Sequence, residues 1–269
     1  ADPAHGIGVL EWKVNGTKAA DLTALKAAIQ EAEGKNESDY TASSWKTFAK
    51  ALEEAKAAAA DNTVTQEAAD LARTNLLKAA NALVKKGEKP EYDNIAPEAK
   101  ADGICDYTND LGGLATLNDG YEPTESHDTS HGAWHNWNNR YENGVAKNAW
   151  VSYTWDKPVE INSMDIYYFS DHGGIVAPKS ASFEYLNDAG EWVVADEAQG
   201  LACEEDEYNT VKLANIKAKA IRMTMEPEFM NDGDPAHGVG VIEWKVYGKY
   251  AEDKPETVDK TALDAVIRE

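Results

Sequence analysis

Two patterns of apolar residues divide this chain of 269 residues. Between residues 20 and 85, apolar side chains recur at spacings of three and four, which is typical of amphipathic α-helices. Three such stripes occur, and each predicts a helix that packs its apolar face against the other two. The stripes are Leu22, Leu25, Ile29 and Ala32; Trp45, Phe48, Leu52 and Ala55; and Ala69, Ala72, Leu76, Ala79 and Leu83.

Short polar breaks separate the three expected helices. The breaks fall at residues 34–36 and 61–63, and Thr41 and Thr65 stand where helix N-caps are expected. Connections this short make neighbouring helices antiparallel. The segment is therefore predicted to form a three-helix bundle.

The apolar pattern changes to that of β-strands after a polar segment at residues 85–90, which contains both glycine and proline. In the first clear strand, Val151, Tyr153 and Trp155 share one face. Many short strands without intervening helices indicate an antiparallel β-sandwich or barrel. Residues 187–190 predict a hairpin turn within it. The expected strands are residues 150–155, 161–169, 181–186, 191–195, 210–213, 220–225 and 239–247.

The beginning and the end of the chain repeat each other. Residues 2–14 return almost unchanged as residues 234–246, and a shorter similarity links residues 23–31 to 261–269. This long repeat indicates a pair of modules and not a solenoid. Because residues 2–14 match a closing strand, we expect them to compete for the same sheet edge in another molecule, which predicts self-association through the N-terminal strand.

The predicted fold class is therefore multidomain α and β, a three-helix bundle followed by an antiparallel β-sandwich. The expected domains are a terminal strand of a preceding sandwich at 1–16, the bundle at 17–86, the sandwich at 87–249, and a linker with the start of a next bundle at 250–269.

Composition narrows the class of partner. Asp and Glu total 48 against 26 for Lys and Arg, a net charge of -22 at pH 7. Such a surface repels nucleic-acid phosphates and anionic lipid headgroups, so neither nucleic acid nor membrane is an expected partner. No nucleophile elbow, phosphate-binding glycine loop or placed acid/base pair is recognisable, so no catalytic residue is expected.

Cysteine content excludes a metal or redox pair of the Cys-x-x-Cys type, because Cys105 and Cys203 are the only two and lie far apart. One bridge between them and two buried free thiols both remain open. His127, His131 and His135 fall at spacings of four, but the glycine and small polar residues around them argue against the helix that such a zinc site would need.

The richest candidate for ligand contact is the segment at residues 128–141, which combines Trp, Asn, His and Arg. Buried amide and charged groups would each need a partner, so the segment is predicted to face a ligand. A sugar offers C–H faces to an indole and hydroxyls to amide, carboxylate and guanidinium groups. A Trp that is only a buried lid over the sandwich is the alternative. The predicted carbohydrate-binding residues are Trp134 or Trp137 for stacking, His135, Asn138 and Arg140, with Asp171 and His172 from a second loop.

Several motifs of the β region have a familiar arrangement: residues 94–96, 118–120 with Thr124, 150–153, 168–180 and 242–246. Through them, residues 94–248 resemble the coagulation-factor 5/8 type C, or discoidin-like, domain, a jelly-roll sandwich, in the versions appended to bacterial glycoside hydrolases. Residues 17–85 more loosely resemble the FIVAR three-helix module through residues 40–45 and 65–67.

The resemblance to the discoidin-like family implies one structural Ca²⁺. Ca²⁺ takes six to eight oxygen ligands, which two carboxylates and turn carbonyls supply. An Asp-Gly turn and a solvated strand Glu are the alternative. The matching ligands are the Asp119 and Glu243 carboxylates, the Thr124 hydroxyl, and the backbone carbonyls near Thr116, Tyr121 and Ile242.

The resemblance also implies a function. We expect a non-catalytic carbohydrate-binding accessory region of a larger bacterial glycoside hydrolase, located outside the cell, in the cell wall or on the cell surface. The expected partner is a glycan that contains galactose or arabinose. The alternative is a structural spacer or oligomerisation stalk without a sugar ligand, and an enzyme in its own right ranks third.

Overall fold

The computed structural model describes residues 19–104, 112–229 and 236–251. The predicted terminal strand at 1–16 lies outside the described residues, and so does the expected linker and start of a next bundle at 250–269, except for residues 250 and 251. Those two predictions stay predictions.

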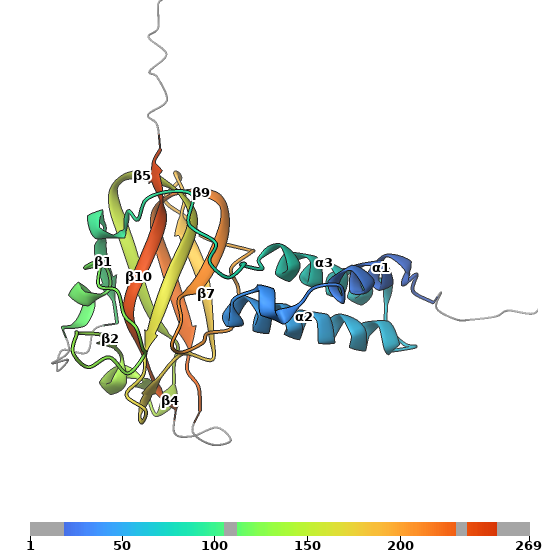
Figure 1. Cartoon of the computed structure of the whole chain (residues 1–269), viewed down its shortest axis with the longest axis horizontal. Helices are drawn as coiled ribbons and strands as arrows, with labels where there is room; N and C mark the ends of the chain where they lie inside the picture. The colour runs from blue at the N-terminus through green and yellow to red at the C-terminus, as the bar shows by residue number, and fades with distance from the viewer. Residues whose placement is uncertain (1–18, 105–111, 230–235, 252–269) are drawn as a thin grey trace, which may run out of the picture. The chain divides into compact units, whose positions relative to one another are not determined.

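Three α-helices form the N-terminal part, as the apolar stripes predict (Figure 1). Leu25, Phe48 and Leu76, one from each stripe, are fully or almost fully buried. The predicted N-cap at Thr65 is confirmed, because its hydroxyl accepts a hydrogen bond from the N–H of Ala68 at 3.1 Å. The helices are α1 (Thr23–Ala32), α2 (Ala42–Ala60) and α3 (Gln66–Asn81), with a short 3₁₀ turn η1 (Glu37–Asp39) between the first two.

The rest of the described chain is an antiparallel β structure, as predicted. In its main sheet, β2, β10, β5, β9, β7 and β8 are hydrogen-bonded neighbours in that order, while β1 pairs with β5 and β6 with β10. The elements are η2 (Ala96–Glu98), β1 (Lys100–Gly103), η3 (Gly113–Thr116), β2 (Trp134–His135), η4 (Trp137–Asn139), β3 (Tyr141–Glu142), β4 (Val145–Ala146), β5 (Ala149–Phe169), β6 (Ile175–Val176), β7 (Ser180–Leu186), β8 (Trp192–Val194), β9 (Asn209–Glu226) and β10 (Gly238–Tyr250).

Two pairs of predicted strands each form one continuous strand in the structure. Residues 210–213 and 220–225 both belong to β9. Residues 150–155 and 161–169 both belong to β5, which pairs along its length with β9. The register shifts between Thr154 and Val159, where the sequence is polar. A bulge lets a strand bend without ending, so a polar interruption in the pattern is a bend here and not a turn.

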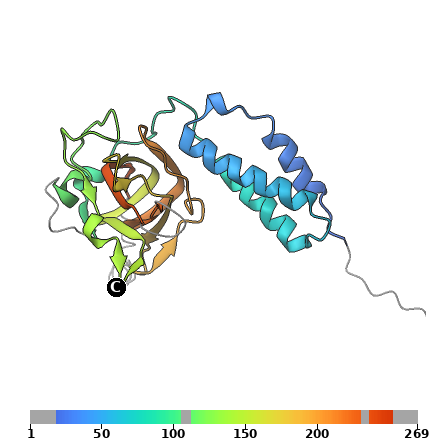
Figure 2. The same ribbon diagram turned by 90° about the horizontal axis from the view of Figure 1, so that it is seen from below.

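The strands of the sandwich curve around a common interior when viewed along them (Figure 2). A large apolar cluster fills the sandwich, and a smaller one includes Phe169 and Ile175. The predicted face of Val151, Tyr153 and Trp155 is buried in the large cluster. The Tyr153 hydroxyl donates within the core, with the carbonyls of Leu117 (2.7 Å) and Trp244 (3.0 Å) as its acceptors. These contacts hold the loop before β2 against the last strand.

Cys203 is a buried free thiol, and Cys105 lies outside the described residues. Burial raises the pKa of the Cys203 thiol to about 12, so it stays protonated at neutral pH. Among the helices of the described residues, none has the length and apolarity of a membrane span.

Candidate functional site

Three loop segments meet at the end of the sandwich where β5 ends and β10 begins. The N–H of Ser170 donates to the carbonyl of Ser126 at 2.9 Å, and the N–H of Gly238 donates to the carbonyl of Gly174 at 2.8 Å. Parallel pairing of β6 with β10 fixes the same junction. We call these segments the loop cluster: residues 126–142, 170–175 and 236–238.

Trp137 and Arg140 form the centre of the loop cluster. The Arg140 guanidinium carbon lies 3.6 Å from the centroid of the Trp137 ring, a cation–π contact. The guanidinium also donates to the carbonyls of Trp137 (2.6 Å) and Ala236 (3.2 Å). The benzene ring of the indole lies so close to Gly174 and Gly238 that a Cβ at Gly174 would stand 2.4 Å from it. One face of Trp137 is therefore covered by Arg140, and a sugar can reach only what remains of the half-buried ring.

The second predicted loop lies in the same cluster. One Asp171 carboxylate oxygen accepts two N–H groups of its own loop, each at 2.8 Å, so this side chain fixes the loop conformation. His172 is exposed at φ 55 and stacks on His127 with the ring centroids 4.3 Å apart. The structure thus brings Asp171 and His172 to the same end of the sandwich as Trp137, Asn138 and Arg140.

The prediction that Trp134 stacks on a sugar is wrong. Its side chain is 0% exposed and lies in the core, where the indole N–H donates to the carbonyl of Ile104 at 2.8 Å. His135, also on β2, is buried, and its ring nitrogen accepts the N–H of Trp137 at 3.3 Å. Within the loop cluster these two residues are structural, because β2 pairs with β10 and the ring polar groups find partners inside the protein.

Sequence reasoning missed two residues of the loop cluster. His127 stacks on His172, and the Tyr141 hydroxyl accepts the N–H of Ala236 at 2.7 Å. In the sequence His127 stands out only through its spacing from His131 and His135. Tyr141 is the last residue of the predicted contact segment, but its short strand has no alternating pattern that would single it out.

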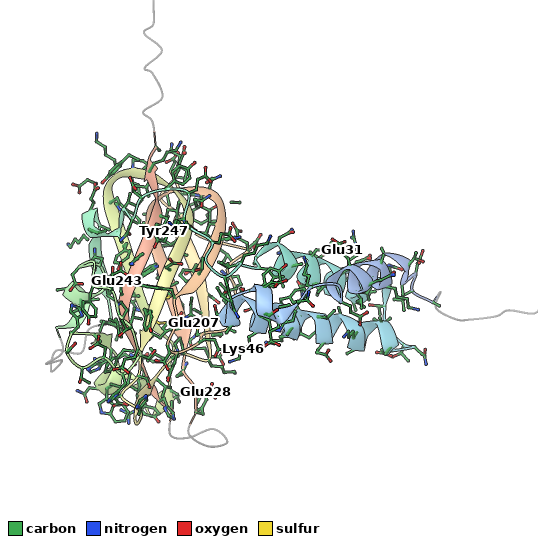
Figure 3. All side chains as sticks on the ribbon, in the orientation of Figure 1. Glu31, Lys46, Glu207, Glu228, Glu243 and Tyr247 are labelled. Carbon is green, nitrogen blue, oxygen red and sulfur yellow. The ribbon has the colours of Figure 1, made fainter. Side chains whose placement is uncertain are left out.

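A second feature of the sandwich is a buried carboxylate on β10. Glu243, labelled in Figure 3, lies on this strand. It is 0% exposed, and neither of its carboxylate oxygens accepts a well-aligned hydrogen bond from the described residues. Burial, and next the negative charge of Asp119, raise the pKa of Glu243 to about 8, although the nearby N–H of Gly120 acts in the opposite direction. A buried anion without a partner is costly, so a cation at this position would be strongly favoured.

Asp119 lies near enough to Glu243 to interact with it electrostatically, and it also contacts the segment before β2. Its two oxygens contact the N–H of Tyr121 (3.1 Å) and Nε2 of His131 (3.0 Å). The Tyr121 and His131 rings stack with centroids 3.8 Å apart, and the Tyr121 hydroxyl donates to Asp128. Hydrogen bonds, first from the Ser130 hydroxyl and then from Tyr121, hold the pKa of Asp128 below its ordinary value. The loop that carries Asp119 is thus held by its own side chains.

The donor set around Glu243 fits a calcium ion. Asp119 and Glu243 are near enough to interact electrostatically, and the N–H of Trp244 donates to the carbonyl of Leu117 at 2.7 Å, which keeps the carbonyl-bearing loop on β10. Thr124 is exposed, so its place among the ligands stays a prediction, as do the carbonyls of Thr116, Tyr121 and Ile242.

No group of three or more His, Cys, Asp or Glu side chains converges on a metal position within the part of the chain that the structure describes. His127, His131 and His135 have separate partners.

Comparison with known families agrees with this geometry. Residues 108–235 match the model of the F5/8 type C domain. The sandwich of this chain is thus similar to the F5/8 type C domain over residues 108–235.

Individual relatives are similar over limited parts. The polysaccharide lyase 8 family protein HylA of Enterococcus faecalis is 46% identical over 69 residues, which make up 26% of this chain and 5% of that protein. The chain thus matches about a twentieth of the length of this curated relative.

Two solved structures are similar to the sandwich. CpGH89CBM32-5 of Clostridium perfringens, in complex with GalNAc-β-1,3-galactose, is 15% identical, covers 58% of this chain and 99% of its own, and has a TM-score of 0.44. The family 32 module of Clostridium perfringens NanJ, in complex with galactose, is 17% identical, covers 57% of this chain and 97% of its own, and has a TM-score of 0.41.

Proposed function

We propose that the sandwich is a non-catalytic carbohydrate-binding module that holds glycan at the loop cluster. The observation that carries the proposal is the gathering of Asn138, Arg140, Asp171 and His172 at one end of a sandwich similar to the F5/8 type C domain. Guanidinium, amide, carboxylate and imidazole groups bind sugar hydroxyls in pairs, and Trp137 fixes the guanidinium in place.

The glycan is neutral in this proposal. A net charge of -22 repels anionic polysaccharides. Galactose- and arabinose-containing glycans are the first ligands to test, and galactose is the sugar in the NanJ structure.

A structural calcium ion completes the proposal. Asp119 and Glu243 would hold it together with carbonyls of the loop before β2, and it would supply the charge that the buried Glu243 carboxylate lacks. The ion would fasten that loop to β10 and take no part in any reaction.

The parent protein is, in this proposal, a secreted or cell-surface bacterial glycoside hydrolase, and the helical part is a FIVAR-like spacer. Tandem modules would raise avidity, because binding by one module keeps the next at high effective concentration. Exchange of the strand at residues 2–14 between molecules remains part of the proposal and follows from its near identity with residues 234–246.

Replacement of Arg140 with alanine tests the proposed site. The variant loses the guanidinium that lies between Trp137 and Ala236, and charge-assisted hydrogen bonds to a ligand are worth about 1.5–3 kcal/mol. We therefore expect binding to galactose- or arabinose-containing polysaccharides to weaken roughly tenfold or more in affinity electrophoresis with calcium present.

Lys249→Ala is the matched control, because Lys249 is also a cation over an aromatic ring, that of Tyr92, but lies near the other end of β10. Its binding should equal that of the wild type. Equal binding by folded Arg140→Ala protein would contradict the loop site, and no binding by the wild type on any matrix would favour the spacer function.

A further inference from the structure

A solvent-exposed tryptophan lies on a different surface of the sandwich. Trp192, on the edge strand β8, is 40% exposed, and Val194 beside it is 47% exposed. No other tryptophan among the described residues reaches this exposure. The sugar-stacking role that the sequence suggested for a Trp of the loop segment therefore has a better-exposed candidate here.

The strand register places Trp192 on the outer face of the sheet. Leu186 of β7 is directly opposite Trp192, and Glu184 is opposite both Val194 and Arg222 of β9. Directly opposite residues share a face, whereas the intervening residues of β7 and β9 are buried in the core. Outward-facing side chains thus form one patch, which we call the β8 patch: Glu184, Leu186, Trp192, Val194 and Arg222.

Within the β8 patch, one face of the Trp192 ring contacts Arg222. The guanidinium carbon of Arg222 lies 4.3 Å from the centroid of the indole ring. Because Arg222 covers that face, the exposed area belongs to the other face and the ring edge. A flat, rigid and open indole face is the surface on which the C–H face of a pyranose packs.

Polar groups beside the indole suit sugar hydroxyls. Nε and Nη2 of Arg222 donate to one carboxylate oxygen of Glu184, at 3.1 and 2.5 Å. Among the described residues, Nη1 of Arg222 and the second oxygen of Glu184 have no partner. The ion pair therefore leaves a fixed donor and a fixed acceptor next to the open ring, as two neighbouring hydroxyls require. At the loop cluster, by contrast, two N–H groups of Arg140 already donate to backbone carbonyls.

We propose that the β8 patch is a second carbohydrate-contacting surface, in which Trp192 stacks on a neutral pyranose and the Arg222–Glu184 pair binds its hydroxyls. The patch holds only three apolar side chains. A stable protein interface buries roughly 1,000 Å² or more, which a surface this small does not provide. Its edge strand has three residues, which offers little for pairing with another strand. The net charge of -22 disfavours anionic polysaccharides.

Affinity electrophoresis on a panel of neutral polysaccharides, with the anionic polygalacturonate as a comparison, tests this surface. Trp192→Ala should weaken binding about tenfold on at least one neutral matrix, the effect of losing an aromatic stack. Trp192→Phe, which keeps a ring, should recover most of the binding. Polygalacturonate should retard neither the variants nor the wild type.

The Arg140→Ala variant separates this proposal from the loop site. A loss in Trp192→Ala that persists in the Arg140→Ala background assigns the β8 patch as an independent contact, whether or not the loop site binds. Unchanged binding of Trp192→Ala on every matrix overturns the proposal, and so does failure of the wild type to bind any. Sedimentation of the wild type as a dimer that Trp192→Ala dissociates would also overturn it, because the patch would then be a contact between copies.

Discussion

Replacement of Trp134 with alanine is expected to lower the free energy of unfolding of the sandwich by about 3–5 kcal/mol. The ring is completely buried in the core, and its loss leaves a cavity and an unpaired carbonyl at Ile104. Urea denaturation followed by near-ultraviolet circular dichroism measures the change.

Trp192→Ala is the control for this experiment, because the same substitution on an exposed edge strand removes little packing. Its unfolding free energy should lie within about 1 kcal/mol of the wild type. A Trp134→Ala protein as stable as the wild type would contradict the burial of this ring and would restore Trp134 as a residue available to a ligand.

Removal of calcium is the second large effect. An ion at about 100 times its dissociation constant stabilises the folded state by about 2.7 kcal/mol. For a domain of this size that corresponds to a melting temperature about 5–10 °C higher with calcium than with EDTA. Glu243→Gln should abolish the difference, because the variant lacks the carboxylate that the ion neutralises.

Stability without calcium should depend on pH through the same residue. Burial raises the pKa of Glu243 from an ordinary 4.5 to about 8, so between these values the folded protein holds a proton that the unfolded chain has lost. The free energy of unfolding of the calcium-free protein should therefore fall as pH rises from about 4.5 to 8. Glu243→Gln should not show that fall.

Glu160→Gln is the control on a neighbouring strand, since Glu160 is paired with Lys249 and is not buried. It should keep both the calcium response and the pH dependence. Equal melting temperatures of the wild-type protein with calcium and with EDTA would contradict the proposed ion site.

Local patterns were enough to predict the helices. The stripe residues Leu25, Phe48 and Leu76 follow the helical period, and all three are buried. The caps are also local, because the Thr65 hydroxyl reaches only to the N–H of Ala68. Such features depend on neighbours within one turn, so the sequence contains them directly.

The long strands and the buried indole depend on contacts that are distant in sequence. β5 continues past its polar interruption because β9 pairs with it on both sides of the bulge at Thr154 and Val159. Trp134 lies among polar residues, but its N–H finds the carbonyl of Ile104, some thirty positions earlier. The polar residues around Trp134 suggest that its side chain is exposed. The hydrogen bond to the Ile104 carbonyl, which depends on the tertiary fold, allows the side chain to be buried.

The sequence indicated which residues could lie together at the candidate site, but not what each of them contacts. Arg140, Asp171 and His172 do lie in one cluster, because β6 pairs with β10 beside them. The sequence could not reveal that Arg140 covers Trp137, since that contact depends on ring orientation. Trp192 was assigned to a strand, but its exposure depends on which face of the sheet it occupies.

The central claim, that this sandwich binds a neutral glycan at the loop cluster, is tested most directly by two-dimensional ¹H–¹⁵N NMR of the full chain with calcium. Each of the 8 tryptophans contributes one indole N–H signal, and substitution with phenylalanine assigns those of Trp134, Trp137 and Trp192. Titration with a galactose- or arabinose-terminated oligosaccharide should shift the Trp137 signal and the backbone signals of residues 138–140 and 171–174, and leave Trp134 unchanged. Saturating oligosaccharide that leaves all loop-cluster signals in place would contradict the account.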